Sequence, residues 1–445
     1  MTTIKKIFSF FGILQCVILL LLYLFLAVYK NDGLLIFLFF YSLFLDFYTI
    51  AKNVDYLLAN NSALIMLLFL FMYGIFQSVV EKFIFGNISD IVYISTLIYA
   101  TTIPSYLISW SFFKKKRYDQ LYINNIKTYK NNKSYNAFLI ILLFILLGYV
   151  TYFFYSIGAL FNPDVLAKER SSIFEDRGQG DIVVGLLISS IFLYFIYYFE
   201  KIPSKTKILV GLLLGYYIVL QLSAGNRRDF MPMILGTYWV VVNVRKIKFS
   251  IFLFLTLLIG VSIFQYLGTV RSNIASDANN SRADNIAITL QSNEFVYPFY
   301  TLTYDVDNYQ KQELKLKYGE SYLYPVIFFI PRNLYPEKPY SLADQFIKRN
   351  FGSRYTMGFA YTPVTEAFVN FGYIGPFLFY LLVGLVVNAI TNRKNQIVNF
   401  IFFTMILDFC RGEMGTFFYQ FFFTGFFLFF LPQFFSILFL RKHYA

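Results

Sequence analysis

The side chains best suited to chemistry lie in the few polar segments that interrupt long apolar runs. The longest of these segments extends from Tyr318 to Gly375. Within it, Arg332 lies between Pro331 and Pro336, and Lys338 follows. Each proline fixes its own φ and biases the preceding residue toward extended backbone. We therefore expect a stiff, non-helical segment that holds Arg332 and Lys338 in place, as a site for an anionic, lipid-linked molecule would require.

A carboxylate follows in the same polar segment. Glu366 and the Asn370-Phe371-Gly372 turn come just before the next apolar run. A carboxylate close to hydrocarbon is costly unless it is paired, and desolvation suits it to proton transfer. Two interpretations stay open for Glu366: a general base with Asn370 beside the substrate, or an ion pair with a nearby arginine. The weaker candidates for the same base are Glu294, Asp305 and Glu413.

A second cationic group consists of Arg227 and Arg228, which follow the small residues Ser223 to Gly225. Both flanking apolar runs are short, so the pair is expected to lie below the headgroups and face a cavity. The alternative is a pair of arginines that reach the headgroups. Because adjacent residues cannot share one helical face, we expect one guanidinium to face the substrate and the other a carboxylate such as Asp229.

The remaining polar segments of the same predicted side are also rich in arginine. Lysine suffices as a topological charge, whereas the guanidinium fork binds phosphate through two hydrogen bonds. This asymmetry favours a phosphate-bearing ligand, although a solvated mixed-charge loop or headgroup anchoring would explain some of these residues. The further candidates for substrate binding are Arg170, Arg177, Arg271 and Arg411.

The composition indicates which elements position these groups. Of the 445 residues, 58% are hydrophobic, 22% aromatic and only 14% charged. These values, with recurring apolar runs of about 20 residues, predict an all-α, polytopic integral membrane protein. The net charge of +13 is then explained by topology and anionic headgroups, so no nucleic-acid partner is expected. Neither a nucleotide-binding motif nor a metal-ligand set is visible, and we expect no cofactor and no metal.

We count twelve candidate spans. If the chain crosses the membrane at each span, every lysine-rich loop and both termini fall on the same side. The positive-inside rule identifies that side as the cytoplasm. The predicted location is therefore the cytoplasmic membrane, with the candidate site on its extracytoplasmic side. The spans cover approximately residues 7–29, 34–50, 63–80, 91–113, 137–160, 182–199, 208–223, 230–244, 249–268, 371–390, 396–410 and 416–440.

This count divides the chain into three parts: helices one to nine over 1–268, a large extracytoplasmic loop over 269–370, and helices ten to twelve over 371–445. A loop of this length is expected to contain short helices of its own; residues 283–292 and 298–309 are the candidates. Tyr322 to Ile330 is apolar but too short to span, which predicts an interfacial or re-entrant segment.

The sequence resembles the Wzy-type O-antigen or capsule repeat-unit polymerases. The similarity in topology covers the whole chain. Locally it lies in S-A-G-N-R-R (Ser223 to Arg228), in Y-G…I-P-R-N-L-Y-P-E-K-P (Tyr318 to Pro339) and in T-P-V-T-E-A-F-V-N-F-G-Y-I-G (Thr362 to Gly375). The chain departs from the family at Tyr335, where tryptophan is usual.

The resemblance implies a glycosyltransferase of the bacterial cell envelope. Such an enzyme moves a glycan from undecaprenyl diphosphate to a second lipid-linked repeat unit, in the biosynthesis of capsular polysaccharide or of the O-antigen of lipopolysaccharide. The implied partners are both lipid-linked oligosaccharides, membrane lipids and a chain-length regulator. In this scheme Arg228 and Arg332 hold the diphosphate and Glu366 accepts the proton of the attacking hydroxyl.

Three alternatives remain. A lipid-linked oligosaccharide flippase or other transporter would also need buried arginines, but not the large outer loop. An O-antigen ligase-like glycosyltransferase is associated with an outer-side histidine, and the single histidine here, His443, is in the predicted cytoplasmic tail. A metal-dependent membrane glycosyltransferase would be expected to carry an acidic pair in its first outer loop, where this chain has only Asp32.

Overall fold

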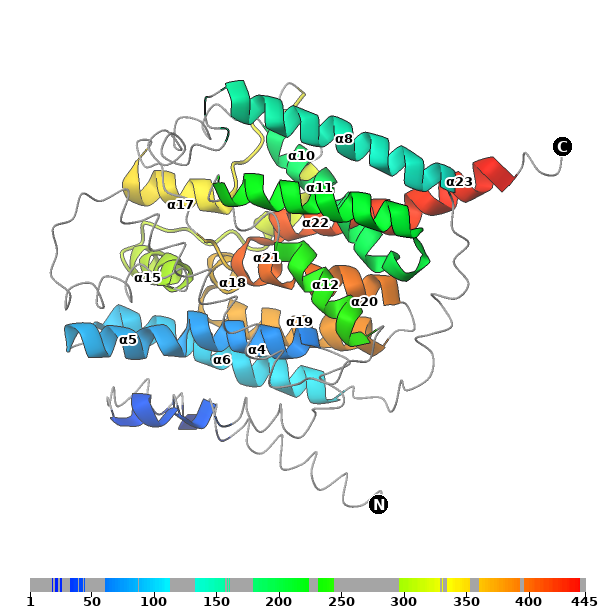
Figure 1. Ribbon diagram of the computed structural model, residues 1–445. Coiled ribbons are helices and arrows are strands. Elements are labelled where there is room, and N and C mark those ends of the chain that lie inside the picture. Colours follow the sequence, from blue (N-terminus) through cyan, green and yellow to red (C-terminus); the bar gives the residue numbers. More distant parts are fainter. Residues whose placement is uncertain are drawn as a thin grey trace, which may run out of the picture. The chain divides into compact units, whose positions relative to one another are not determined.

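The structure is a computed structural model. It describes residues 18, 21–22, 25, 33–38, 40–42, 44, 61–86, 88–112, 133–156, 158, 160, 179–223, 231–243, 296–328, 330, 334–352, 360–392 and 396–440 (Figure 1). Throughout these residues the regular structure is helical. Five of the helical stretches are long and apolar enough to cross a membrane, which makes the chain a multi-pass membrane protein by helix length and hydropathy.

These five stretches confirm five of the predicted spans in type and approximate position. They are Ile65–Lys82, Asp90–Ser109, Lys133–Ser156, Pro363–Ile390 and Met414–Phe435. Shorter apolar helices cover Val183–Tyr197 and Met231–Val241. The predicted span at 249–268 lies outside the described residues, as does the predicted short helix at 283–292.

The chain forms two compact units, and each is built from separated stretches of sequence. Unit 1 combines residues Met1–Arg117, Asn280–Arg393 and Asp408–Phe418, and unit 2 combines Tyr118–Asn279, Lys394–Leu407 and Tyr419–Ala445. The described residues of unit 1 from Val296 onward therefore pack with early helices of the chain. The three parts predicted from sequence (1–268, 269–370 and 371–445) were defined by predicted membrane crossings, whereas these two units are defined by which residues pack together.

The core of unit 1 is the pair of helices α6 (Asp90–Phe112) and α19 (Gly375–Asn392), with α4 (Asn61–Tyr73) and α5 (Ile75–Phe85) beside α6 (Figure 1). Small residues let α6 and α19 approach closely, as is typical of helix pairs in membranes. A Cβ atom on Gly384 would overlap Ser109 Oγ and lie 2.7 Å from the Tyr106 carbonyl oxygen. Ser105 Oγ also donates to the Phe377 carbonyl.

Four short helices between residues 296 and 371 belong to unit 1, and the first and last of them pack against α6. They are α15 (Val296–Gln310), α16 (Tyr324–Phe328), α17 (Leu342–Phe351) and α18 (Pro363–Phe371). The prediction of a helix over 298–309 is confirmed by α15. The span predicted to begin at residue 371 is preceded by α18, and Gly372, at φ 64°, separates the two helices. Only glycine adopts such a φ without strain.

Unit 2 contains α8 (Lys133–Ser156), α10 (Gln179–Tyr197), α11 (Ser204–Ser223), α12 (Met231–Asn243) and α20 (Gln396–Thr404). The end of α22 (Met414–Gly425) continues through a π-helical turn at Phe426–Phe430 into α23 (Leu431–Leu440). Tyr135 Oη donates to the Phe427 carbonyl at 2.9 Å. That bond satisfies an acceptor within the irregular turn.

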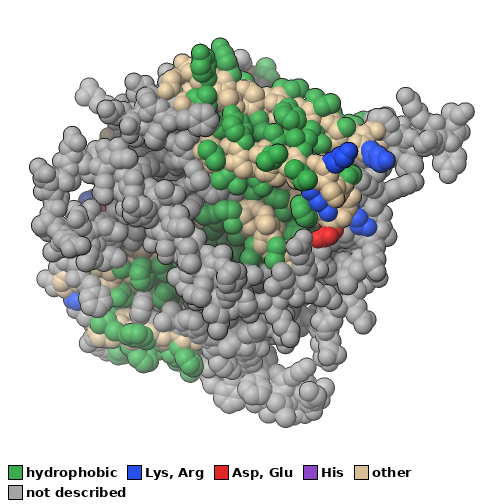
Figure 2. All heavy atoms as spheres, in the orientation of Figure 1, with side chains coloured by type: hydrophobic (Ala, Val, Ile, Leu, Met, Phe, Trp, Pro, Cys, Tyr) green, Lys and Arg blue, Asp and Glu red, His purple; other side chains and the backbone are tan. Residues whose placement is uncertain are grey.

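The described face of α8 and α11 shows the pattern of a membrane surface (Figure 2). Apolar side chains such as Ile141, Ile145 and Leu212 are well exposed along it. The described lysines gather at one end of this face (Figure 2), and the N-terminal ends of the two helices carry Lys133, Lys205 and Lys207. Apolar flanks with cations gathered at one end are typical of helices that cross a membrane.

Candidate functional site

The candidate site in unit 1 is built around α18, whose start is fixed by its own sequence. Thr362 is the N-cap and its Oγ1 accepts from the Thr365 amide at 3.3 Å, while Pro363 occupies the first helical turn. Both features are favoured at helix starts. Tyr99 Oη of α6 lies 3.0 Å from Thr362 Oγ1 and donates to the Pro298 carbonyl at 3.2 Å. The N-terminal end of α18 is thereby attached to α6 and α15.

Glu366 lies one turn into α18 and is only 1% exposed. Its two carboxylate oxygens accept from different segments: Oε1 from Ser321 Oγ at 2.6 Å, and Oε2 from the Met414 amide at 2.7 Å. Met414 is the first residue of α22, so the carboxylate caps one of the unpaired amides at that helix start, where a negative charge is also favoured by the helix dipole. The donors on Glu366 are thus neutral groups, and neither is the arginine that one interpretation required.

Asn370 completes this cluster. It is fully buried, and its Nδ2 donates to Ser321 Oγ at 2.7 Å and to the Glu366 carbonyl at 2.8 Å. Its Oδ1 accepts from the Gly319 amide at 2.9 Å. We call Ser321, Glu366, Asn370 and the Met414 amide the Glu366 cluster. It joins three segments that are remote in sequence, and every side chain in it has its hydrogen-bonding groups engaged.

The turn before α22 also contacts α17. Glu413 Oε2 accepts from the Leu342 amide at 2.6 Å, which caps the start of α17 together with Ser341. Arg411 ends α21 (Ile406–Arg411) immediately before this turn. Arg411, a predicted substrate-binding residue, and Glu413, a weaker candidate base, therefore lie close in sequence to Met414 of the Glu366 cluster.

Lys338 is buried, with only 5% of its surface exposed. Its Nζ donates to the Ile330 carbonyl at 3.1 Å and its amide donates to the Tyr335 carbonyl at 3.1 Å. The lysine thus holds together the two ends of the proline-containing segment. The other predicted cations, Arg170, Arg177, Arg227, Arg228, Arg271 and Arg332, lie outside the described residues.

A second buried carboxylate, Asp305 on α15, is fully enclosed. It pairs with Arg349 of α17 and accepts from Tyr361 Oη, and these two partners occupy different oxygens. Burial raises the pKa of Asp305 to about 6, although the Arg349 guanidinium and the Tyr361 hydroxyl act in the opposite direction. The sequence marked Asp305 only as a weaker candidate base; nothing in its spacing indicated that Arg349 and Tyr361 would meet it.

Asp305 gives a pH prediction. An unfolded aspartate has a pKa of about 3.9, so between about pH 4 and pH 6 the folded chain binds a proton that the unfolded chain releases. This contribution to stability is present below about pH 4 and is lost as the pH rises through 6. Relative to Asp305→Asn, the wild type should lose about 1 kcal/mol of unfolding free energy between pH 5 and pH 7.5.

The measurement is thermal or denaturant unfolding of both purified proteins across this pH range. The comparison with Asp305→Asn removes the titration of all other groups, which the two proteins share. Parallel pH profiles, or a wild type that gains stability with rising pH relative to the variant, would contradict the prediction and show that the Arg349 ion pair outweighs burial.

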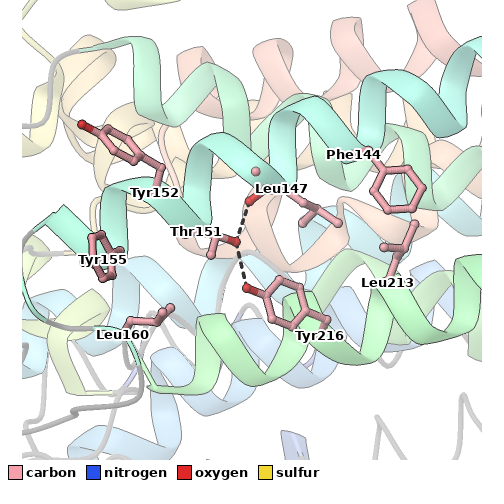
Figure 3. A pocket seen from close by; sticks show the side chains of 9 residues that line it. Phe144, Leu147, Thr151, Tyr152, Tyr155, Leu160, Leu213 and Tyr216 are labelled. Atoms are coloured by element: carbon pink, nitrogen blue, oxygen red, sulfur yellow. Dashed lines mark hydrogen bonds between the residues drawn. The ribbon is translucent and has the colours of Figure 1, made fainter.

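A hollow in unit 2 lies between α8 and α11 (Figure 3). It has a volume of about 480 Å³ and is lined by Phe144, Leu147, Gly148, Thr151, Tyr152, Tyr155, Leu160, Leu213 and Tyr216. Thr151 Oγ1 lies 2.8 Å from Tyr216 Oη and donates to the Leu147 carbonyl at 2.8 Å, as the dashed lines in Figure 3 mark. Among the described residues that line it there is no carboxylate, lysine or arginine, and the surface they offer is mainly apolar.

The structure thus brings together Glu366 and Asn370 from the predicted set and adds Ser321 and the Met414 amide, which the sequence analysis missed. Ser321 carried no local signal, because its partners are 45 and 49 residues away. Comparison with models of known protein families, with curated proteins and with solved structures finds no match for this chain.

Proposed function

We propose that this chain is a polymerase that joins lipid-linked oligosaccharide repeat units at the extracytoplasmic side of the bacterial cytoplasmic membrane, with twelve spans and both termini in the cytoplasm. The observation that carries the proposal is the Glu366 cluster: a buried carboxylate inside the one long polar segment of a membrane protein. An ionisable group in such surroundings is costly and is retained most often for function.

The proposed reaction is a glycosyl transfer. The acceptor sugar hydroxyl attacks the anomeric carbon of the donor glycan, and the bond from that carbon to the undecaprenyl diphosphate oxygen breaks. The hydroxyl proton passes to Glu366, and the negative charge remains on the departing diphosphate. Guanidinium groups form paired hydrogen bonds to phosphate oxygens. We therefore assign binding of the diphosphate, and of the lipid-linked substrate as it enters the site, to Arg227, Arg228, Arg332, Arg170, Arg177 and Arg271.

Because both oxygens of Glu366 are engaged, proton transfer requires that one bond opens when substrate binds. The Ser321 bond is the candidate, since a sugar hydroxyl can replace the serine hydroxyl as the donor to Oε1. Hydrogen bonds in a substrate-free site commonly rearrange in this way. Asn370 then keeps Ser321 in place through its own donor bond.

The test is reconstitution of the purified chain in vesicles with purified lipid-linked repeat units, scored by the formation of a ladder of products. We expect a ladder with or without a chelator. Translocation of the repeat unit without a ladder would favour a transporter, and loss of the ladder on chelation would favour a metal-dependent glycosyltransferase.

The arginine assignment makes a prediction within the same assay. Arg228→Ala and Arg332→Ala should each reduce ladder formation by about 100-fold or more, as expected when a donor to developing negative charge is lost. Lys315→Ala is the matched control, because Lys315 is an exposed cation of the predicted extracytoplasmic loop that also contains Arg332, and it should leave the ladder unchanged. Wild-type ladders from both arginine variants, at equal protein levels, would remove these residues from the site.

A further inference from the structure

The polar segment of unit 1 exposes a row of large apolar side chains around α16. Leu323, Val326, Ile330 and Leu334 follow one another at intervals of three or four residues, and Val326 and Leu334 are 70% and 78% exposed. We call these four residues the α16 surface. A series of well-exposed large apolar side chains is unusual on a protein in water and indicates a site of interaction.

The occupant of the α16 surface is indicated by its neighbour, α19. Exposed apolar side chains recur on one face of α19 at four-residue spacing, namely Ile374, Leu378, Leu382 and Val386. The stretch that contains them is long and apolar enough to cross a membrane, so lipid covers this face. Helix α19 itself, which begins one residue after Ile374, has 18 residues, or about 27 Å at 1.5 Å per residue, close to the thickness of the hydrocarbon core.

Aromatic stacking joins α16 to the N-terminal end of this lipid-facing row. Tyr322, in the 3-10 turn Glu320–Leu323 before α16, stacks on Phe379 of α19 with centroids 5.8 Å apart and planes at 4°. It also stacks on Phe371, at 6.2 Å and 28°. The start of the α16 surface therefore lies beside the N-terminal end of α19, where the lipid-facing row begins.

The polar groups around α16 indicate how deeply it lies. The helix has only five residues and cannot span, and its flanks carry groups that favour the headgroup region. Lys317 Nζ donates to Tyr324 Oη at 3.2 Å and lies 5.7 Å from the centre of that ring, and Tyr318 is 79% exposed. Tyrosines and lysines of this kind are typical of membrane interfaces.

Hydrogen bonds hold the α16 surface just before its first residue and at Ile330. Ser321, just before it, belongs to the Glu366 cluster, and the Ile330 carbonyl within it accepts from the buried Lys338 Nζ. A short apolar helix held at both ends in this way presents its side chains in a constant direction.

We propose that the α16 surface is inserted in the lipid bilayer, at the boundary between headgroups and acyl chains beside the N-terminal end of α19. Its partner is the lipid surface itself. The proposal depends on neither the proposed function nor the side of the membrane on which α16 lies, so each can fail without the other.

The experiment places an environment-sensitive fluorophore on single cysteines in the full-length chain, with Cys16 and Cys410 replaced by alanine, and reconstitutes it in phosphatidylcholine and phosphatidylglycerol vesicles. The test positions are Val326→Cys and Leu334→Cys. Leu382→Cys, on the exposed face of α19, is the lipid control, and Glu313→Cys, on the exposed turn after α15, is the water control. All four side chains are exposed, so labelling disturbs no core packing.

The readout is quenching by spin-labelled lipids that carry the label near the headgroup or near the end of the acyl chain. Both test positions should be quenched several-fold more strongly by the shallow label than by the deep one, and Leu382→Cys should show the reverse order. The proposal would be overturned if the fluorophores at Val326→Cys and Leu334→Cys behaved like the one at Glu313→Cys. They would then be quenched by iodide in the aqueous phase and unaffected by the lipid quenchers. Strongest quenching by the deep label would also overturn it, because the segment would then be re-entrant.

Discussion

Replacement of Glu366 by glutamine is expected to slow extension of the glycan by about 100- to 10,000-fold, the range typical for loss of a general base. The substitution changes little in the packing. The amide oxygen of the new side chain can still accept from the Met414 amide, and its NH₂ group can donate to Ser321 Oγ, which already accepts from Asn370. The cost in stability is therefore about one hydrogen bond, or roughly 1 kcal/mol.

Ser321→Ala is the variant that separates a catalytic from a structural role. It removes the hydroxyl that donates to Glu366 Oε1 but leaves the carboxylate in place and more accessible. If Glu366 is the base, Ser321→Ala should retain most of the activity that Glu366→Gln loses. Equal activity losses in the two variants, matched by equal losses of stability, would show that Glu366 only holds the cluster together.

The second large effect is structural: Gly384→Leu should prevent the chain from folding. A Cβ on Gly384 would overlap Ser109 Oγ and meet the Tyr106 carbonyl. Both belong to α6, and a helix carbonyl cannot move aside without displacing the helix. Even Gly384→Ala should cost about 1–3 kcal/mol, as overpacking typically does, and the leucine variant should yield no monodisperse protein after detergent extraction.

Gly148→Leu is the matched control for this prediction. Gly148 is also a glycine within a membrane-spanning helix, but no described atom lies within 4 Å of a Cβ built on it. A side chain there enters the hollow between α8 and α11, so yield and thermal stability should stay close to wild type. If Gly384→Leu and Gly148→Leu gave the same yield and thermal stability, the prediction that Gly384 is needed for the close approach of α6 and α19 would be wrong.

Much of the fold could be predicted because hydropathy and helix length are local properties. The five long apolar stretches, the helix of α15 and the break at Gly372 were all expected from neighbouring residues alone. The start of α18 was not, because residues 363–371 were assigned to the polar segment. In that helix the polar residues Thr365, Glu366 and Asn370 are buried like the apolar ones, so polarity there did not mark exposed loop.

The candidate site was predictable only in part. Glu366 and Asn370 stood out because they are polar residues at the edge of an apolar run, and both belong to one cluster. Ser321 and the Met414 amide could not be found from the sequence, since hydrogen bonds across 45 and 48 residues leave no local signal. Asp305 was recognised as a carboxylate, but its pairing with Arg349 depends on how α15 and α17 pack.

The discontinuous make-up of unit 1 has a consequence for biosynthesis. Ser105 and its acceptor at Phe377 are 272 residues apart, so α6 is complete long before α19 leaves the ribosome. At about 5–20 residues per second, that interval is about 14 to 54 s. During this time the serine-rich face of α6, with Ser105 and Ser109, has no α19 to cover it in the nascent chain. We expect the insertion machinery or another temporary helper to shield it, and cells that lack such help should degrade the chain before its C-terminal third is joined to the first helices.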